Sequence, residues 1–562
     1  MKILVERYAY KSELLQDKLP SDWLLPMKDG RVMLNKVGYY RSPNSSELFL
    51  IVPKVFETTI DHFDNIPLES LAQDSVLTLF KQYGRSHTEI EYIYRFALSL
   101  YLSLREFQKR VNDTTIVRQD FVQNILSTLS DNETSELDCV LSLVQFYRDN
   151  RDLIIFKVKQ IQSQHFKRTD WRKTVRKVTP ILVDNGKTPI YIETIQKQRE
   201  PDNEEELFTI FFSLMHYFHK EYGLNTKFDL GGLVLLDKIG DPSVQRRLAK
   251  RLKALKNQYF TDRLKRLLIL TLQYFEKKET ARTQQGRPEY VICQDYHLVF
   301  EDMIDKLLSD EVYERKLKEQ SDGKIVDHIF KSESLFSPDA IWYIGDSKYY
   351  KPTTLLSENA IYKQHTYAKN VIQYNINLFN AKESETYLRY RDELTEGYNI
   401  TPNFFIQAFI HPYDFTKSKA DFKFKEEGTY VNRHFFNRVF DRDSLSVHTF
   451  DINFMFVFQN YIHSNYTVLN DFKRIARENI RKEVKRFYQT HFDFYEIEPF
   501  IEITLFIEKY FKLLNGKIYR RSDMKDTTVI ILGLEKSLQF EEENNKILTL
   551  IAQDCHYKSF YL

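Results

Sequence analysis

The spacing of apolar residues changes along the chain and predicts a β-rich start followed by helices. Two apolar runs at residues 31–41 and 47–56 flank a stretch of turn-forming residues at 42–46, a pattern typical of a β-hairpin. From about residue 68 to residue 156 the apolar residues recur at helical spacing. We therefore expect an N-terminal domain with a β-hairpin over residues 1–115 and a helical middle region over residues 116–285.

A different order of elements follows between residues 295 and 409, where the pattern predicts a helix, two strands joined by a turn, a second helix and a further strand. The first helix, Tyr296–Leu308, carries an apolar stripe with Glu301 at its edge. The two strands cover residues 324–330 and 341–348 and are expected to pair as a hairpin. These elements predict an α/β core in a domain over residues 286–462, followed by a helical C-terminal extension over residues 463–562. The expected fold class is α+β with several domains.

Length, charge and cysteine content limit the class of protein. A chain of 562 residues exceeds what one hydrophobic core usually serves. Its 81 basic and 79 acidic residues nearly cancel, so the net charge does not indicate a polyanionic partner. The three cysteines lie far apart and lack the paired spacing of a zinc site. No apolar stretch reaches the roughly 18 residues that a membrane span needs, and charged residues interrupt the start where a signal peptide would be apolar. We expect a cytoplasmic protein with no membrane contact.

The end of the strand 341–348 carries the strongest candidate for chemistry. Residues two apart in a strand face the same way, so Asp346 and Lys348 project together and Ser347 points to the opposite face. Hydrolysis of a phosphodiester needs carboxylates that hold a divalent cation, together with an ammonium that orients the attacking water or helps to deprotonate it. Two other acidic-x-Lys triplets, Glu314-Arg315-Lys316 and Glu483-Val484-Lys485, lie in helical patterns. Only this triplet ends a strongly apolar strand, where an unpaired charge is costly. We expect Mg²⁺ here.

Two residues are candidates for the second carboxylate. Asp339 follows a proline, but a strand from Asp339 to Asp346 would separate the two carboxylates by more than about 20 Å at roughly 3.3 Å per residue. Asp327 lies on the preceding strand and can face Asp346 across the hairpin, so strand geometry favours Asp327. Glu301 is expected to support the metal or the water from the helix edge. The predicted metal ligands are Asp327, Asp346 and Glu301.

Two further sets of residues are candidates for contact with DNA. Gln364 and Tyr367 lie three apart in the next predicted helix and so share a face. A densely basic helix over residues 472–488 is expected to contact the DNA backbone through Lys482, Lys485 and Arg486. The alternative for both sets is an ordinary solvated helix face. The chain has no phosphate-binding loop of an NTPase.

Six separated segments within about residues 32–461 carry a family resemblance. They are Val37-Gly38-Tyr39, Ile51-Val52-Pro53-Lys54, Asp170-Trp171-Arg172-Lys173-Thr174, Ile344-Gly345-Asp346-Ser347-Lys348-Tyr349-Tyr350, Lys363-Gln364-His365-Thr366-Tyr367 and Phe450-Asp451-Ile452-Asn453-Phe454. Together they resemble the LlaJI family of restriction endonucleases, which is related to the McrC nuclease subunits. The last hundred residues are outside this resemblance.

The resemblance implies a restriction nuclease subunit whose PD-(D/E)xK site cuts double-stranded DNA. It also implies a separate AAA+ partner, an McrB-like GTPase, that faces the N-terminal part of the chain. We therefore expect the hairpin around Arg41 to dock on that partner. Two alternatives stay open at this stage: a non-catalytic adaptor that grips DNA for such a motor, and a stand-alone nuclease acting on RNA or branched DNA.

Overall fold

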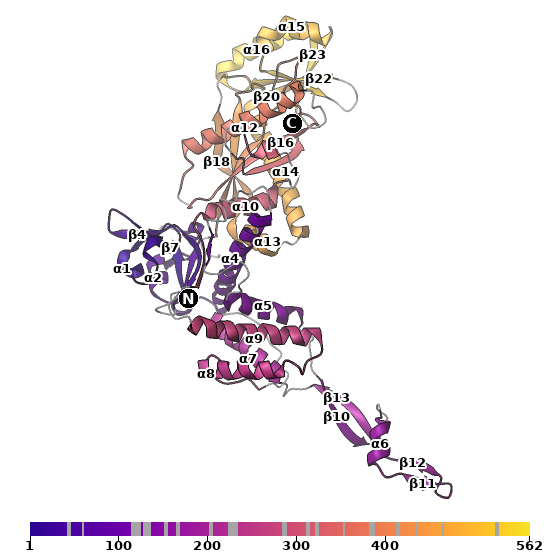
Figure 1. Ribbon diagram of the computed structural model, residues 1–562. Helices are drawn as coiled ribbons and strands as arrows, with labels where there is room; N and C mark the ends of the chain where they lie inside the picture. Colours follow the sequence, from indigo (N-terminus) through magenta and orange to yellow (C-terminus); the bar gives the residue numbers. More distant parts are fainter. Residues whose placement is uncertain are drawn as a thin grey trace. The chain divides into compact units, whose positions relative to one another are not determined.

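The computed structural model is an α+β protein with more than one compact unit, as the sequence predicts (Figure 1). It describes residues 1–41, 47–58, 61–113, 125–127, 136–150, 156–163, 169–201, 206–222, 234–283, 289–310, 315–320, 325–351, 354–381, 388–411, 416–417, 419–432, 435–463, 466–522 and 528–562. One unit comprises Met1–Glu89, Phe96–Ser127 and Glu289–Leu562, and the other comprises Ile90–Arg95 and Thr128–Pro288. None of the helices in these ranges is both long and apolar enough to cross a bilayer. Segments from both ends of the chain therefore share the first unit.

The N-terminal part of the first unit is built on a five-stranded sheet. Its strands are ordered β1 (Lys2–Val5), β6 (Leu48–Val52), β5 (Val37–Arg41), β14 (Glu289–Cys293) and β9 (Ile125–Ser127). Strands β5 and β6 pair antiparallel, which confirms the predicted hairpin, and its turn at residues 42–46 lies outside the described residues. Strand β1 runs parallel to β6 with Val5 opposite Val52. The residues that follow these two strands therefore emerge at the same edge of the sheet.

Short strands and helices surround this sheet. They are β2 (Ala9–Lys11), α1 (Ser12–Leu15), η1 (Ser21–Trp23), β3 (Leu24–Pro26), β4 (Arg31–Leu34), η2 (Lys54–Phe56), β7 (His62–Phe63), β8 (Ile66–Pro67), α2 (Leu68–Gln73), α3 (Val76–Gln82) and the long helix α4 (His87–Asp113). Strands β2, β4 and β3 form a small antiparallel sheet. Helices α2, α3 and α4 fall within the region that the sequence predicts to be helical, whereas α1, η1 and η2 lie before it.

The second unit is mainly helical, as expected, and also carries a β-ribbon. Its helices are α5 (Glu136–Asp149), α7 (Glu206–Tyr222), α8 (Pro242–Leu255) and α9 (Asp262–Thr283). Strands β10 (Phe156–Ser163) and β13 (Thr194–Pro201) pair antiparallel, and between them in the chain come α6 (Trp171–Lys177), β11 (Ile181–Val183) and β12 (Thr188–Ile190) (Figure 1). We call these five elements the arm.

The C-terminal half of the first unit contains the predicted α/β core. Its five-stranded sheet has the order β15 (His328–Glu333), β16 (Ala340–Lys348), β17 (Asn403–Phe409), β19 (Leu445–Asn453) and β18 (Lys423–Asn432). Strands β15 and β16 form the predicted hairpin, whereas β16, β17 and β19 run parallel. The first strand was predicted over residues 324–330, but β15 begins at His328, so Asp327 comes directly before the strand and not within it. Helix α10 matches the expected bounds, Tyr296–Leu308. The other helices of this region are α11 (Arg315–Lys318), α12 (Glu358–Asn380) and α13 (Phe454–His463).

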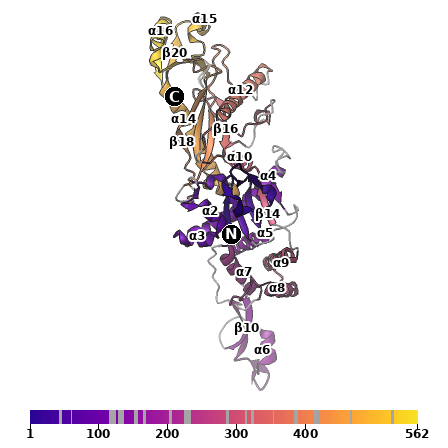
Figure 2. The ribbon, with the colours of Figure 1, turned by 90° about the vertical axis from the view of Figure 1, so that its left-hand side faces the viewer.

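The C-terminal extension starts with the expected basic helix, α14 (Tyr466–His491), and α12 and α14 flank the sheet on opposite sides (Figure 2). The rest of the extension differs from the expected helical structure. It forms a four-stranded sheet in the order β21 (Ile518–Ser522), β22 (Thr528–Glu535), β20 (Phe492–Pro499) and β23 (Cys555–Phe560), with α15 (Ile503–Leu514), η4 (Leu538–Phe540) and α16 (Glu541–Ile551). The alternating apolar residues of β20 and the β-branched run in β22 favour strands over helices.

Candidate active site

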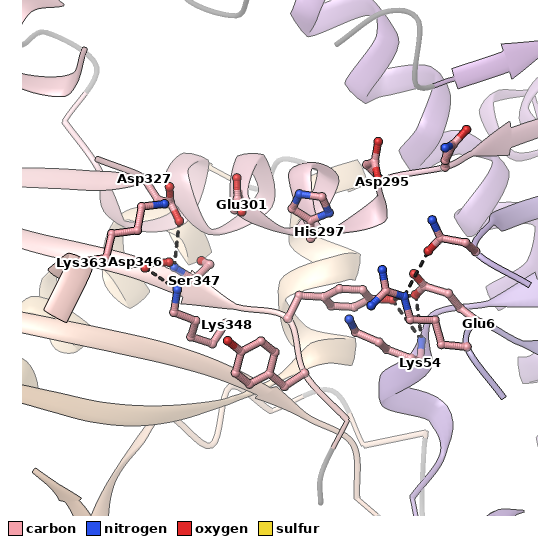
Figure 3. Close-up of a pocket in the computed structure, with 15 residues that line it drawn as sticks. Glu6, Lys54, Asp295, His297, Glu301, Asp327, Asp346, Ser347, Lys348 and Lys363 are labelled. Atoms are coloured by element: carbon pink, nitrogen blue, oxygen red, sulfur yellow. Dashed lines mark hydrogen bonds and ion pairs between the residues drawn. The ribbon is translucent and has the colours of Figure 1, made fainter. Parts of the chain in front are cut away.

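A cleft of about 280 Å³ lies where β16 ends, and it collects most of the residues predicted to do chemistry (Figure 3). Helix α10 forms one wall, the loop before β15 and the end of β16 contribute carboxylates, and α12 contributes a lysine. The predicted residues that line the cleft are Glu301, Asp327, Asp346 and Lys348. The sequence patterns that place them are local, because each depends on the period of one helix or one strand.

Asp346 and Lys348 project into the cleft together, as their spacing in β16 requires. The Nζ atom of Lys348 lies 2.5 Å from Oδ2 of Asp346. Burial alone would lower the pKa of Lys348, but the charges of Asp346 and Asp327 raise it above its ordinary value. The side chain is therefore an ammonium at neutral pH. Such a group can orient water or neutralise developing negative charge, whereas it has no lone pair with which to take a proton.

Asp327 comes directly before β15 and faces Asp346 across the hairpin. Its Oδ2 accepts a hydrogen bond from the backbone amide of Ser347 at 3.2 Å, so the catalytic strand itself holds this carboxylate in place. Burial raises the pKa of Asp327 well above its ordinary value, and the charges of Glu301 and Asp346 raise it further. The Asp327 and Asp346 carboxyls are also close enough to share a hydrogen bond. Two carboxyls this close repel each other when both are ionised.

Glu301 extends from α10 into the same cleft (Figure 3). Burial, and next the charge of Asp346, raise its pKa to about 8. A divalent cation among these carboxylates would remove the repulsion that raises their pKa values. In the described part of the chain no three His, Cys, Asp or Glu side chains converge closely enough to enclose a metal. Mg²⁺ commonly takes one or two protein carboxylates and completes its shell with water and substrate phosphate. The pair Asp327 and Asp346 fits that pattern.

Asp339 lies at the other end of the strand and does not line the cleft. Its Oδ2 accepts a hydrogen bond from the Ser337 hydroxyl at 2.9 Å, and its backbone carbonyl accepts one from Ser334. Seven residues of extended chain separate it from Asp346, which corresponds to roughly 23 Å. Asp339 therefore has a local role at the β15–β16 turn in this structure.

Gln364 and Tyr367 are buried, so the structure does not support their predicted contact with DNA. The Gln364 amide donates to Oδ1 of Asn403 at 2.6 Å, and the Asn403 amide donates back to the Gln364 carbonyl, which ties α12 to β17. Lys363, their neighbour in the same helix, lines the cleft instead. The sequence shows a lysine directly before Gln364, which could have indicated this role. The helical period alone, however, does not determine which face of α12 is buried.

The basic residues of α14 divide into two groups. Lys473 donates to the carbonyl of Ser309 at 2.8 Å, and Arg477 and Arg481 donate to other carbonyls of the core. These three basic side chains therefore have a structural role, since they attach α14 to the α/β core. The residues predicted to contact DNA lie elsewhere on the helix: Lys482 and Arg486 are exposed and Lys485 is half-buried. Their predicted role stays a prediction.

Two histidines, His328 and His411, make contacts typical of structural residues. His328 is buried with its Nε2 2.5 Å from the Ser347 hydroxyl oxygen, and His411 lies 2.8 Å from Asp421. Arg41 is half-buried at the end of β5, next to the turn outside the described residues.

Sequence reasoning missed the other half of the cleft altogether. It is lined by Glu6, Arg7, Asn35, Lys54, Gln294, Asp295 and His297, from segments far from the catalytic strand in sequence.

Comparisons with known proteins add little to this geometry. No family model matches the chain, and no curated protein does. Among solved structures, the chain overlaps a chain of an assembly described as Thermococcus gammatolerans McrB AAA+ hexamers with bound McrC. The sequence identity is 11 %, the overlap covers 85 % of this chain and 99 % of that chain, and the TM-score is 0.27. At that TM-score the overlap carries no argument about fold or function.

Proposed function

We propose that the protein is a Mg²⁺-dependent endonuclease that hydrolyses phosphodiester bonds of double-stranded DNA, as the nuclease subunit of a restriction or anti-phage defence system. The observation that supports it is the convergence of Asp327, Asp346, Lys348 and Glu301 in one cleft at the end of β16. Burying a lysine and several carboxylates is costly, even though the lysine is ion-paired with one of them. The carboxylates offer ligands for a hard cation, and the lysine offers a positive charge for the reacting phosphate. Perturbed carboxyls in a cleft are typical of catalytic sites.

The residues divide the work as follows. Asp327 and Asp346 would hold Mg²⁺, which when bound polarises the phosphoryl oxygen and lowers the pKa of water. The Lys348 ammonium donates hydrogen bonds that orient the attacking water or the phosphate. Glu301, on α10, would accept a hydrogen bond from a water molecule in the cleft. The Ser347 amide keeps Asp327 turned toward Asp346.

The test is nicking of supercoiled plasmid DNA in Mg²⁺ by single variants. Asp327→Ala, Asp346→Ala and Lys348→Ala should each lower the rate by at least ~100-fold, because each removes a group that acts on the reacting phosphate. Glu301→Gln should fall between these and the wild type. Asp339→Ala is the matched control, since it removes a carboxylate of the same strand outside the cleft. A dead Asp339→Ala beside an active Asp327→Ala would overturn the assignment.

The partner in this proposal is an AAA+ NTPase, an McrB-like GTPase, with the hairpin around Arg41 as one docking element. Deleting residues 42–46 should then lower nucleotide hydrolysis by the partner or split the complex on a sizing column. If both stay unchanged, the hairpin is not the docking element. A stand-alone nuclease is the competing proposal. An adjacent gene for an AAA+ NTPase, and cleavage that depends on its product, would decide between them.

The arm of the second unit is a second surface for such a partner. Its helix and hairpin expose apolar side chains that are each about half accessible, and these are Trp171, Val175, Ile181, Leu182, Ile190 and Ile192. All six belong to one short segment of the chain, and exposed apolar residues that lie close together commonly mark a protein interface. Replacing residues 169–193 by a short Gly-Ser turn should abolish co-elution with the AAA+ protein. Unchanged co-elution would remove the arm from the interface.

A further inference from the structure

The N-terminal domain forms one end of the nuclease cleft. The parallel pairing of β1 and β6 places the residues after both strands at one edge of the sheet. Arg7 follows β1 and Lys54 follows β6, and both line the cleft together with the catalytic carboxylates. This end carries the cations Arg7 and Lys54 as well as the carboxyls of Glu6 and Asp295. The two cations can contact a polyanion that passes from one end of the cleft to the other.

Arg7 is held in an unusual conformation. Its φ angle is 56°, in the left-handed region that is unfavourable for a residue other than glycine. The Arg7 amide donates to the carbonyl of Leu34 at 2.8 Å, and the Arg7 Nε donates to Oδ1 of Asn35 at 3.1 Å. The guanidinium is exposed, and in the described part of the chain it makes no ion pair. One of its five N–H groups is thus used to fix its orientation, and the others remain for a ligand.

Lys54 contacts the residue that directly follows β16. Its ammonium lies 4.4 Å from the ring centre of Tyr349, the residue after Lys348. The Tyr349 hydroxyl donates to Glu6, and the Lys54 amide donates to that hydroxyl at 3.0 Å. Within the described ranges the ammonium makes no ion pair, although the buried Glu6 attracts it. Burial first, and then the positive charges of Arg7 and Lys351, lower the pKa of Lys54. An anion at this end of the cleft would relieve that repulsion.

Helix α10 runs along the cleft and contributes residues to both of its ends. Asp295 and His297 at the start of the helix lie toward Lys54 and Glu6, whereas Glu301 lies toward Asp327 and Asp346 (Figure 3). His297 and Glu301 are four residues apart, which is roughly 6 Å along a helix.

We propose that Arg7 and Lys54 form a phosphate-binding subsite that holds the backbone of the cleaved DNA strand at the end of the cleft opposite Asp327 and Asp346. The N-terminal domain is then part of the substrate site as well as a docking element. This inference rests on the proposed function, because it takes the same DNA strand as its ligand. It assigns Arg7 and Lys54 to contacts with the backbone and not with bases, since a guanidinium and an ammonium on phosphate carry no sequence information.

The test is binding of a fluorescein-labelled 20-base-pair duplex in EDTA, where no cleavage occurs, at several salt concentrations. Each lost phosphate contact lowers the slope of log K against log salt by about 0.9. We expect that decrease for Arg7→Gln and for Lys54→Gln, about twice that for the double variant, and recovery in Arg7→Lys. Lys28→Gln and Arg31→Gln are matched controls, because both residues are exposed in the same domain and lie outside the cleft. Thermal melts equal to wild type would show that the variants fold.

The outcomes separate this inference from the proposed function. If the slopes of Arg7→Gln and Lys54→Gln equal those of the wild type and the controls, or if the duplex does not bind at all, the subsite is wrong. That result leaves the catalytic assignment standing wherever Asp346→Ala abolishes nicking. If the slopes fall but the wild type does not cut DNA in Mg²⁺, the subsite stands and the proposed nuclease activity fails.

Discussion

Asp305→Asn probes a buried chain of polar groups behind the catalytic strand. The Asp305 carboxylate lies 2.8 Å from the Lys318 ammonium and 3.4 Å from Nδ1 of His328. His328 in turn contacts the Ser347 hydroxyl near the end of that strand. Burial alone would raise the pKa of Asp305, but the charge of Lys318 and the hydrogen bond with His328 hold it well below its usual range. The carboxylate is therefore ionised at neutral pH.

The size of the effect follows from the burial of the pair. Removing one partner of a buried ion pair costs roughly 3–5 kcal/mol, because the other charge stays behind. Lys318 is 9 % exposed and the Asp305 side chain 23 %, so we expect about 3 kcal/mol at pH 7, the lower end of that range. That loss would lower Tm by roughly 6–12 °C in a domain of 150–250 residues. We expect a smaller decrease here, because the compact unit that contains Asp305 is larger than that. Since the native pKa of Asp305 lies below its unfolded value of about 3.9, the stabilisation is complete above that value and is lost as pH falls toward the native pKa.

The assay is thermal unfolding of the wild type, Asp305→Asn, Lys318→Met and the double variant, followed by fluorescence. At pH 7 both single variants should melt earlier, and the double variant should lose less than their sum because no unpaired charge remains. The gap between wild type and Asp305→Asn should narrow as pH is lowered to about 3.5, close to the unfolded pKa. Equal melting of the wild type and Asp305→Asn at pH 7, or strictly additive losses, would refute the reasoning.

Two further predictions concern the strand and the basic helix. A Cβ at Gly345 would overlap the ring of Phe404 on the neighbouring strand, so Gly345→Ala should cost about 1–3 kcal/mol by overpacking. It should also slow plasmid nicking, and adding Phe404→Leu should restore part of both; full activity in Gly345→Ala alone would contradict this. Replacing Lys482, Lys485 and Arg486 by Gln should weaken binding to every duplex alike and reduce its salt dependence. Unchanged binding, or a loss confined to one sequence, would rule out a backbone contact.

Local sequence pattern predicted the elements that carry the chemistry. The bounds of α10 and the existence of the β15–β16 hairpin follow from the 3.6-residue and two-residue periods of their apolar residues, although β15 lies a few residues later than predicted. The same two-residue period places Asp346 and Lys348 on one face of β16. The preference for Asp327 over Asp339 as the carboxylate beside Asp346 also needed only the length of an extended strand. These features depend on residues within one element or one hairpin, so a single sequence suffices.

Contacts between distant segments decided the rest. A helical period shows that Gln364 and Lys363 lie on different sides of α12, but only the packing against β17 determined that Gln364 is buried and that Lys363 lines the cleft. Glu6 and Lys54 contact Tyr349, the residue after β16, across about 300 residues of sequence, through hydrogen bonds that involve the Tyr349 hydroxyl. No local period encodes such a contact, because it results from the complementary shape and charge of surfaces that meet only when the chain has folded.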